Sequence, residues 1–252
     1  MVISNIANNL IGQTQSSQST QQATSDPVTK ALKRASDRID QQLGSTKVQL
    51  SAYGQIKSAF SDVQAAGNAL SNLKKTATAD DIKKAVQGFV DAYNKANKAV
   101  GTATQGDGKQ AGALANDARA RLAGNDLRRS VAEGGNLADL KNIGVTQNKD
   151  GTLAVDSKAL DKALQANPDQ VRSALGATGQ QVEKAAAREL ANNGNVGKSV
   201  NALSNRSNNL EAQQSAQQDL LLASQRAVTQ QATLINNTFA SGIAAYQRTF
   251  SG

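Results

Sequence analysis

The chain has 252 residues, carries 28 Lys and Arg against 20 Asp and Glu, and contains neither Cys nor His. It therefore cannot form a Ser–His–Asp or Cys–His nucleophilic site, a thiolate zinc site or an imidazole metal site. Only 38% of its residues are hydrophobic, and its aromatic residues are four Phe and three Tyr. This composition favours extended helices over a large close-packed core.

Residues 1–27 are rich in Ser, Gln, Thr and Asn. We expect this segment to be disordered in the free protein, because it has too few apolar side chains to offset the entropy of ordering. Its apolar opening, Val2 to Ile11, has no basic flank and no small-residue cleavage site, so it does not resemble a cleaved signal peptide. No apolar run in the chain reaches the ~18 residues that a membrane-spanning helix needs.

Residues 28–75 are predicted to form one long helix that begins at Asp26-Pro27, with Asp as its N-cap and Pro in its first turn. Its apolar positions recur every three and four residues, which is typical of a coiled coil. The predicted seam includes Leu43, Leu50, Tyr53, Ile56, Phe60 and Val63.

Residues 199–252 carry a second narrow apolar stripe on a polar helix, as in a coiled coil. The predicted seam includes Leu210, Leu221, Val228 and Ile235, followed by the more apolar group Phe239, Ile243, Tyr246 and Phe250. Polar residues interrupt this seam, which indicates a helix that depends on a partner. We expect the two terminal helices to pair within one chain, and the last four apolar residues to contact another protein.

Residues 76–198 are predicted to form a small helical body with one β-hairpin. A helix begins at Asp80-Asp81, and a loop follows at residues 101–112. Another helix spans residues 114–131, and Gly134-Gly135 interrupts the chain. Alternating apolar residues flank Asp150-Gly151 within residues 143–155, which is a hairpin signal. Asp156 and Asn167-Pro168 are predicted to cap two further helices. The predicted fold class is therefore mainly α, with long N- and C-terminal coiled-coil helices and a small α+β body that contains the hairpin.

The sequence offers no convincing catalytic or metal-binding site. The stretch that ends in Gly108-Lys109 lacks the first Gly and the final Ser or Thr of a phosphate-binding loop. The region around Asp150 lacks the first and last carboxylates of a calcium-binding loop. Asp80, Asp81 and Asp156 are explained by their positions at helix starts. We expect no catalytic residue, cofactor or metal, and no enzyme activity.

Three stretches resemble the flagellar filament cap family, also called hook-associated protein 2. Residues 45–74 resemble its N-terminal coil, and residues 89–100 (FVDAYNKANKAV) resemble its Phe-Val-x-x-Tyr-Asn helix. Residues 140–176 resemble its most distinctive segment, an Ile-Gly hairpin with Asp-Gly-Thr-Leu followed by two short helices. The family's large β-rich outer region, normally inserted before the second stretch, is absent here, because residues 75–80 join the parts directly.

This resemblance implies a structural protein that caps the distal end of the bacterial flagellar filament and promotes flagellin folding and insertion. It implies an extracellular location at the flagellum tip, reached through the flagellar secretion system without a cleaved signal. The implied partners are flagellin, the filament tip and a flagellar export chaperone, without nucleic acid or membrane insertion. The implied self-assembly is a ring of about four to six copies, with a pentamer expected and a tetramer or hexamer as alternatives.

Two other functions fit parts of the sequence. A flagellin or hook–filament junction protein would also have terminal coils, although the hairpin segment argues against it. A basic nucleic-acid-binding coiled coil would fit the net charge of +8. The interleaving of basic with acidic residues, without basic runs that include aromatics, favours a mixed solvated surface instead.

Overall fold

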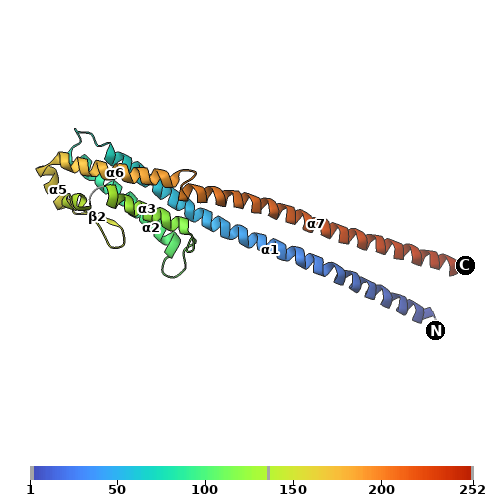
Figure 1. The fold of residues 1–252 in the computed structure, drawn as a ribbon. Coiled ribbons are helices and arrows are strands. Elements are labelled where there is room, and N and C mark those ends of the chain that lie inside the picture. Colours follow the sequence, from blue (N-terminus) through green and yellow to red (C-terminus); the bar gives the residue numbers. More distant parts are fainter. Residues whose placement is uncertain (1–2, 135–136, 251–252) are drawn as a thin grey trace. The chain divides into compact units, whose positions relative to one another are not determined.

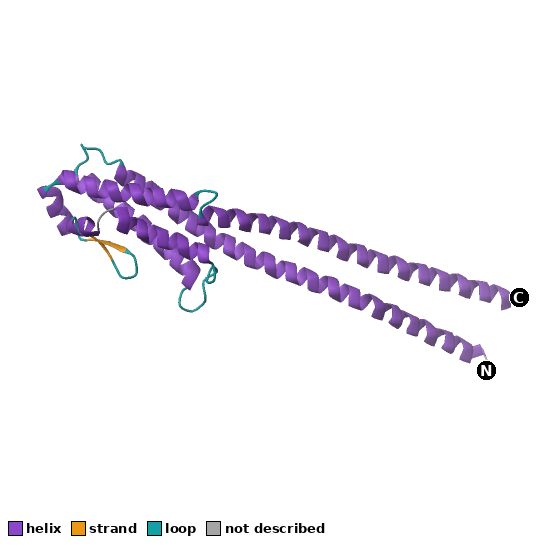
Figure 2. Ribbon diagram, in the orientation of Figure 1, coloured by secondary structure: helices purple, strands orange, loops and turns teal. Residues whose placement is uncertain are grey.

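The computed structural model describes the backbone of residues 3–134 and 137–250, and the side chains of residues 29–132 and 137–249. Figure 2 shows helices throughout, with a single hairpin. The elements in chain order are α1 Ile3–Ser71, α2 Ala79–Gln105, α3 Ala118–Gly134, α4 Leu137–Asn142, β1 Val145–Gln147, β2 Leu153–Val155, α5 Ser157–Ala166, α6 Pro168–Leu190 and α7 Asn195–Phe250. This architecture confirms the predicted fold class.

The chain divides into two compact units. One comprises Ser45–Arg206, and the other comprises Met1–Gly44 together with Ser207–Gly252. The two long helices therefore contribute to both units. We call the first the body and the second the rod. This division differs from the expected one, in which residues 28–75 formed a coil separate from the body.

The body has one hydrophobic core, to which all of its helices and both strands contribute. Its largest fully buried side chains include Tyr53 and Phe60 from α1 and Tyr93 from α2. The helices α3 and α6 pack along each other (Figure 1). Several helices thus enclose these aromatic side chains, whereas a narrow coiled-coil seam would leave them partly exposed to solvent.

Short-range signals in the sequence set most of the helix boundaries. Thr78 caps α2, and its hydroxyl accepts a hydrogen bond from the Asp81 amide while the Asp81 carboxylate accepts one from the Thr78 amide. Asp156 caps α5, and Asn167 caps α6 just before Pro168. These side chains satisfy amides that have no partner within a helix's first turn. The predicted starts of these helices are therefore confirmed.

The hairpin pairs β1 with β2 in antiparallel register, with Val145 opposite Val155 and Gln147 opposite Leu153. Gly151 lies in the turn with φ of +82°. That conformation strains residues with a Cβ, so the Asp-Gly sequence fits the turn it was predicted to form.

In the rod, α1 and α7 run side by side and antiparallel (Figure 1). The Gln214 side chain donates a hydrogen bond to the Asp40 carboxylate at 2.6 Å, and the Gln217 side chain donates one to the Leu32 carbonyl at 2.9 Å. Leu43 and Leu210 are buried. The two terminal helices therefore pair within the chain through a seam that mixes apolar contacts with polar ones.

Several expected helix boundaries differ from the structure. The helix predicted to begin at Asp26-Pro27 instead runs back to Ile3, through the segment expected to be disordered. Extending an existing helix is much cheaper than nucleating a new one, and this stretch contains no further Pro. The helix α2 continues to Gln105 into the expected loop, and the helix expected over residues 114–131 is α3, at Ala118–Gly134. The helix α6 runs through Gly176 and Gly179. Tertiary packing thus overrides the weak helix propensity of glycine.

Candidate assembly surfaces

The outer half of α7 is the most exposed apolar surface among the described side chains. Ten large hydrophobic side chains are exposed among the described residues. Seven of them lie on this helix: Leu220, Leu222, Val228, Leu234, Phe239, Ile243 and Tyr246. Phe239, Ile243 and Tyr246 are 42%, 50% and 59% exposed. Apolar surface concentrated in this way is typical of a site that another protein covers.

The structure describes the side chains of three of the four residues in the predicted contact group. Phe239, Ile243 and Tyr246 lie three and four residues apart on α7, so they share one face of the helix. The side chain of Phe250 lies outside the described residues. The group therefore remains a prediction, which the exposure of its three described members supports.

The predicted seam residues fall into two environments. Tyr53, Ile56, Phe60 and Val63 lie in the core of the body and are fully buried. Leu43 and Leu210 are buried in the rod, whereas Val228 is 44% exposed. Leu50, Leu221 and Ile235 are half-buried. On α7, the seam is thus buried at Leu210 and partly or largely exposed at the positions beyond it.

The hairpin is held on the body by an amide side chain that sequence reasoning missed. The Asn94 side chain on α2 donates to the Leu153 carbonyl at 2.8 Å, and the Leu153 amide donates to the Asn94 Oδ1 at 2.7 Å. Asn94 therefore pairs with β2 as a neighbouring strand would. The Tyr-Asn pair within residues 89–100 marked this position, although no local rule gives an Asn in a helix that role.

Two more side chains hold the turn of the hairpin. The Asn97 side chain donates to the Asp150 carbonyl at 3.2 Å, and the Arg128 guanidinium donates to the Asn97 Oδ1 at 3.1 Å. The hairpin is thereby tied to both α2 and α3. It forms a fixed feature of the body surface on which an assembly contact could be built.

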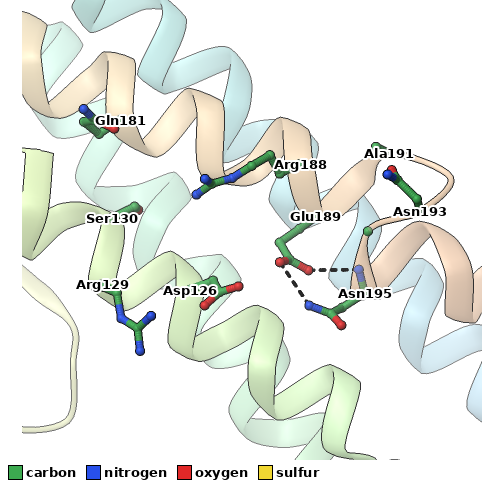
Figure 3. A pocket seen from close by; sticks show the side chains of 10 residues that line it. Asp126, Arg129, Ser130, Gln181, Arg188, Glu189, Ala191, Asn193 and Asn195 are labelled. Carbon is green, nitrogen blue, oxygen red and sulfur yellow. Dashed lines mark hydrogen bonds between the residues drawn. The ribbon is translucent and has the colours of Figure 1, made fainter.

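A polar pocket of about 590 Å³ opens between α3, α6 and the start of α7 (Figure 3). Its charged lining residues are Asp126 and Arg129 from α3, and Arg188 and Glu189 from α6. The Glu189 carboxylate accepts hydrogen bonds from the Asn195 amide at 3.2 Å and from the Asn195 side chain at 3.1 Å. Glu189 thus caps the first turn of α7, which sequence reasoning also missed because the cap comes from the preceding helix.

Glu189 is only 6% exposed although it is ionisable. Burial raises the pKa of its carboxyl group, and the facing Asp126 carboxylate raises it further. The hydrogen bonds from Asn195 lower that pKa without outweighing burial.

Asp150, which sequence reasoning assigned to a turn, accepts a hydrogen bond from the amide of Thr152. Asp107, for which sequence reasoning made no assignment, accepts hydrogen bonds from the amides of Lys109 and Gln110. Among the described residues, no group of three or more acidic side chains is placed to hold a metal ion. Over the same part of the chain, no helix has the length and apolar character needed to cross a bilayer.

Comparison with known proteins agrees with the resemblance seen in the sequence. The family described as the flagellar hook-associated protein 2 C-terminus matches residues 61–251. A B-type flagellar hook-associated protein 2 of Pseudomonas aeruginosa is 37% identical over 123 residues, which cover 44% of this chain and 26% of that protein. An A-type flagellar hook-associated protein 2 of Pseudomonas aeruginosa is 37% identical over 94 residues, which cover 34% of this chain and 19% of that protein.

The matched stretches thus span about a quarter or less of these relatives, whereas the family match covers most of this chain. The family match includes the hairpin, the Asn94 side chain that holds the hairpin, the polar pocket and nearly all of α7. The chain belongs to the flagellar hook-associated protein 2 family.

Proposed function

We propose that this protein is a structural assembly protein that caps the distal end of the bacterial flagellar filament and promotes the folding and insertion of flagellin. Membership of the family supports this role, since the matching relatives are named flagellar hook-associated proteins. The single structural observation that carries the proposal is the concentration of exposed apolar side chains on the outer half of α7.

In this proposal Phe239, Ile243, Tyr246 and Phe250 contact the filament end. Burying a large apolar side chain contributes roughly 1.5–3 kcal/mol, so covering several of them would hold the cap firmly in place. The half-buried seam residues Leu221 and Ile235, and the exposed Val228 between them, would be covered further in the assembled state. The remaining seam residues, from Leu43 to Val63 and at Leu210, hold the chain's own helices together.

The proposal also covers location and partners. The protein would pass through the flagellar secretion system with an export chaperone and remain outside the cell at the flagellum tip. Its copies would form a ring of about four to six subunits, for which a pentamer is the expected form. The body, with its fixed hairpin, would supply the contacts between copies.

The test is complementation of a strain that lacks this gene. A variant with Phe239, Ile243 and Tyr246 all replaced by Ser should remain folded, because these side chains are exposed, yet it should fail to restore swimming. Flagellin should then appear as monomer in the medium, and electron microscopy should show short or missing filaments. Replacing the exposed Gln213, Gln218 and Gln225 by Ser supplies the matched control, which should restore swimming. Full-length filaments with the first variant would contradict the proposed contact, and full-length filaments without the gene would contradict the capping role.

A further inference from the structure

The turn between α6 and α7 contains the only Asn-Gly pair in the sequence, Asn193-Gly194. Asn193 is exposed, and within the described part of the chain no group forms a hydrogen bond with its side chain. It lies at the edge of the polar pocket, which the proposed assembly role does not use (Figure 3). An unrestrained amide directly before a glycine is where asparagine is chemically least stable, because glycine has no side chain to shield its backbone nitrogen.

Packing keeps a glycine at position 194. A methyl group added there would lie 2.0 Å from the Arg188 carbonyl oxygen and 2.5 Å from the Glu189 carbonyl oxygen. Both obstacles are backbone atoms at the end of α6, so a residue with a side chain would fit only if the turn moved. The close attachment of α7 to α6 therefore preserves the reactive pair.

Asn192 and the two Asp-Gly pairs of the chain lack this combination. The Asn192 side chain accepts a hydrogen bond from Asn201 at 3.3 Å, and the residue after it is an asparagine. The Asp107 and Asp150 carboxylates precede glycines but accept hydrogen bonds from nearby backbone amides. Carboxylates are ionised at neutral pH, and an ionised carboxylate is a poorer target for attack by nitrogen than a neutral amide is.

We propose that Asn193 is a site of spontaneous deamidation through a cyclic imide, which alters the turn between α6 and α7 as the protein ages. The Gly194 nitrogen gives up its proton and bonds to the Asn193 Cγ, and the side-chain nitrogen leaves with that proton as ammonia. Water then opens the ring at one of its two carbonyl carbons. Opening at Cγ gives aspartate, and opening at the main-chain carbonyl gives isoaspartate, in which the backbone continues through the side chain.

The folded turn sets the rate of this reaction. The Gly194 amide donates a hydrogen bond to the Ala191 carbonyl at 2.8 Å, and this bond must open before the nitrogen can attack. Deamidation should therefore be slower in the folded chain than in the same chain unfolded in urea. Isoaspartate lengthens the backbone of a turn in which Gly194 has no spare room, so its formation weakens the attachment of the first turn of α7 to α6.

Peptide mapping of the intact chain tests the proposal. After the folded protein is incubated in mildly alkaline buffer, trypsin should release peptide 189–198, which contains Asn192, Asn193 and Asn195. Fragmentation should place the modification at Asn193 at least about tenfold more often than at the other two, since only Asn193 precedes a glycine. Asn193→Gln should leave this peptide unmodified. Asn192→Gln is the matched control and should react as the wild type does.

The products distinguish the proposed route from simple hydrolysis. The cyclic imide gives a mixture of aspartate and isoaspartate, so aspartate alone would overturn the cyclic route. Equal modification of Asn192 and Asn193 would overturn the choice of site. The site would also be overturned if Asn193 stayed unmodified in the folded chain while the unfolded chain reacted.

Hydrogen exchange at the amides of residues 195–199 measures the effect on α7. Protein enriched in isoaspartate at position 193 should exchange faster there than fresh protein does, whereas the amides of α3 should change little. Unchanged exchange at residues 195–199 would overturn the weakening of this attachment. None of these results depends on capping, so failure here is distinguishable from failure of the proposed function.

Discussion

Gly67 on α1 and Gly179 on α6 touch backbone to backbone, and a methyl group added at Gly67 would lie 2.7 Å from the Gly179 carbonyl oxygen. The reverse contact is closer still, since a methyl group at Gly179 would lie 2.5 Å from the Gly67 carbonyl oxygen. The two helices can approach this closely only because both positions lack a side chain. Neither obstacle is the flexible end of a side chain, so relief requires a shift of a helix.

Gly67→Ala is therefore expected to destabilise the body by about 1–3 kcal/mol, through the overpacking of a tight helix crossing. Urea denaturation followed by circular dichroism measures the change. Gly54→Ala, on the same helix with nothing within 4 Å of the added methyl group, is the control. It should be neutral or stabilising by up to about 1 kcal/mol, because alanine is the better helix former. Equal effects of the two substitutions would contradict the close approach.

Asn94→Ala should loosen the hairpin. The substitution removes two hydrogen bonds to the backbone of Leu153 and leaves its amide and carbonyl groups without these partners. A loss of about 2–4 kcal/mol is expected from two bonds and the partly buried groups they satisfied. Hydrogen exchange at the Leu153 amide should accelerate strongly, whereas the α3 amides should change little. Asn208→Ala, at an exposed position on α7, should leave exchange at Leu153 unchanged.

Leu210→Asp should separate the two helices of the rod. The side chain is only 5% exposed, and a charge placed there must either be hydrated or remain unpaired in the seam. Circular dichroism should show lower helix content and a lower melting temperature. The neighbouring exposed position provides the control Asn209→Asp, which should keep the helix content and the melting temperature of the wild type. Indistinguishable melting curves would argue against the contribution of this seam to stability.

Alkaline pH should unfold the body through its buried tyrosines. Burial raises the pKa of Tyr93 to about 12, and burial also raises the pKa of Tyr53 far above its usual range. A raised tyrosine pKa means that the folded state favours the neutral phenol. The resulting stabilisation is complete below the usual tyrosine pKa and is lost as pH rises through the raised values.

Urea midpoints measured from neutral pH to about pH 11 should therefore fall once pH exceeds roughly 10, the usual tyrosine value. Tyr93→Phe removes one of the two ionisable groups and should make this fall shallower. Ultraviolet difference absorbance should show tyrosinate forming at Tyr53 and Tyr93 together with unfolding. Ionisation of both groups in a body that remains folded would contradict their burial.

The features that the sequence predicted best are those encoded within a few residues. The caps at Asp156 and Asn167-Pro168 and the turn at Asp150-Gly151 depend on neighbouring backbone groups, so short-range rules identify them. The assignment of Tyr53 and Phe60 to a coiled-coil seam was incomplete for the opposite reason. The same apolar spacing serves a two-helix seam or a multi-helix core, and only tertiary packing distinguishes them.

The long-range contacts could not be read from local patterns. Asn94 and Leu153 are separated by 59 residues, and an asparagine within a helix is ordinarily a solvated polar residue. Glu189 was similarly indistinguishable from a surface glutamate, because its partner begins the next helix and its facing carboxylate comes from α3. The rule that places a helix start at Pro27 ignores the helix that already lies on its N-terminal side.

The connection between α1 and α2 has a practical consequence. The first helix ends at Ser71, and the second begins with a complete capping box of its own at Thr78 and Asp81. Within the connection itself, the Ala77 amide donates a hydrogen bond to the Lys74 carbonyl at 3.0 Å. A folded domain whose ends lie close together could therefore be spliced between Lys74 and Thr78 at little energetic cost. The chain thus offers a ready scaffold for displaying a guest protein.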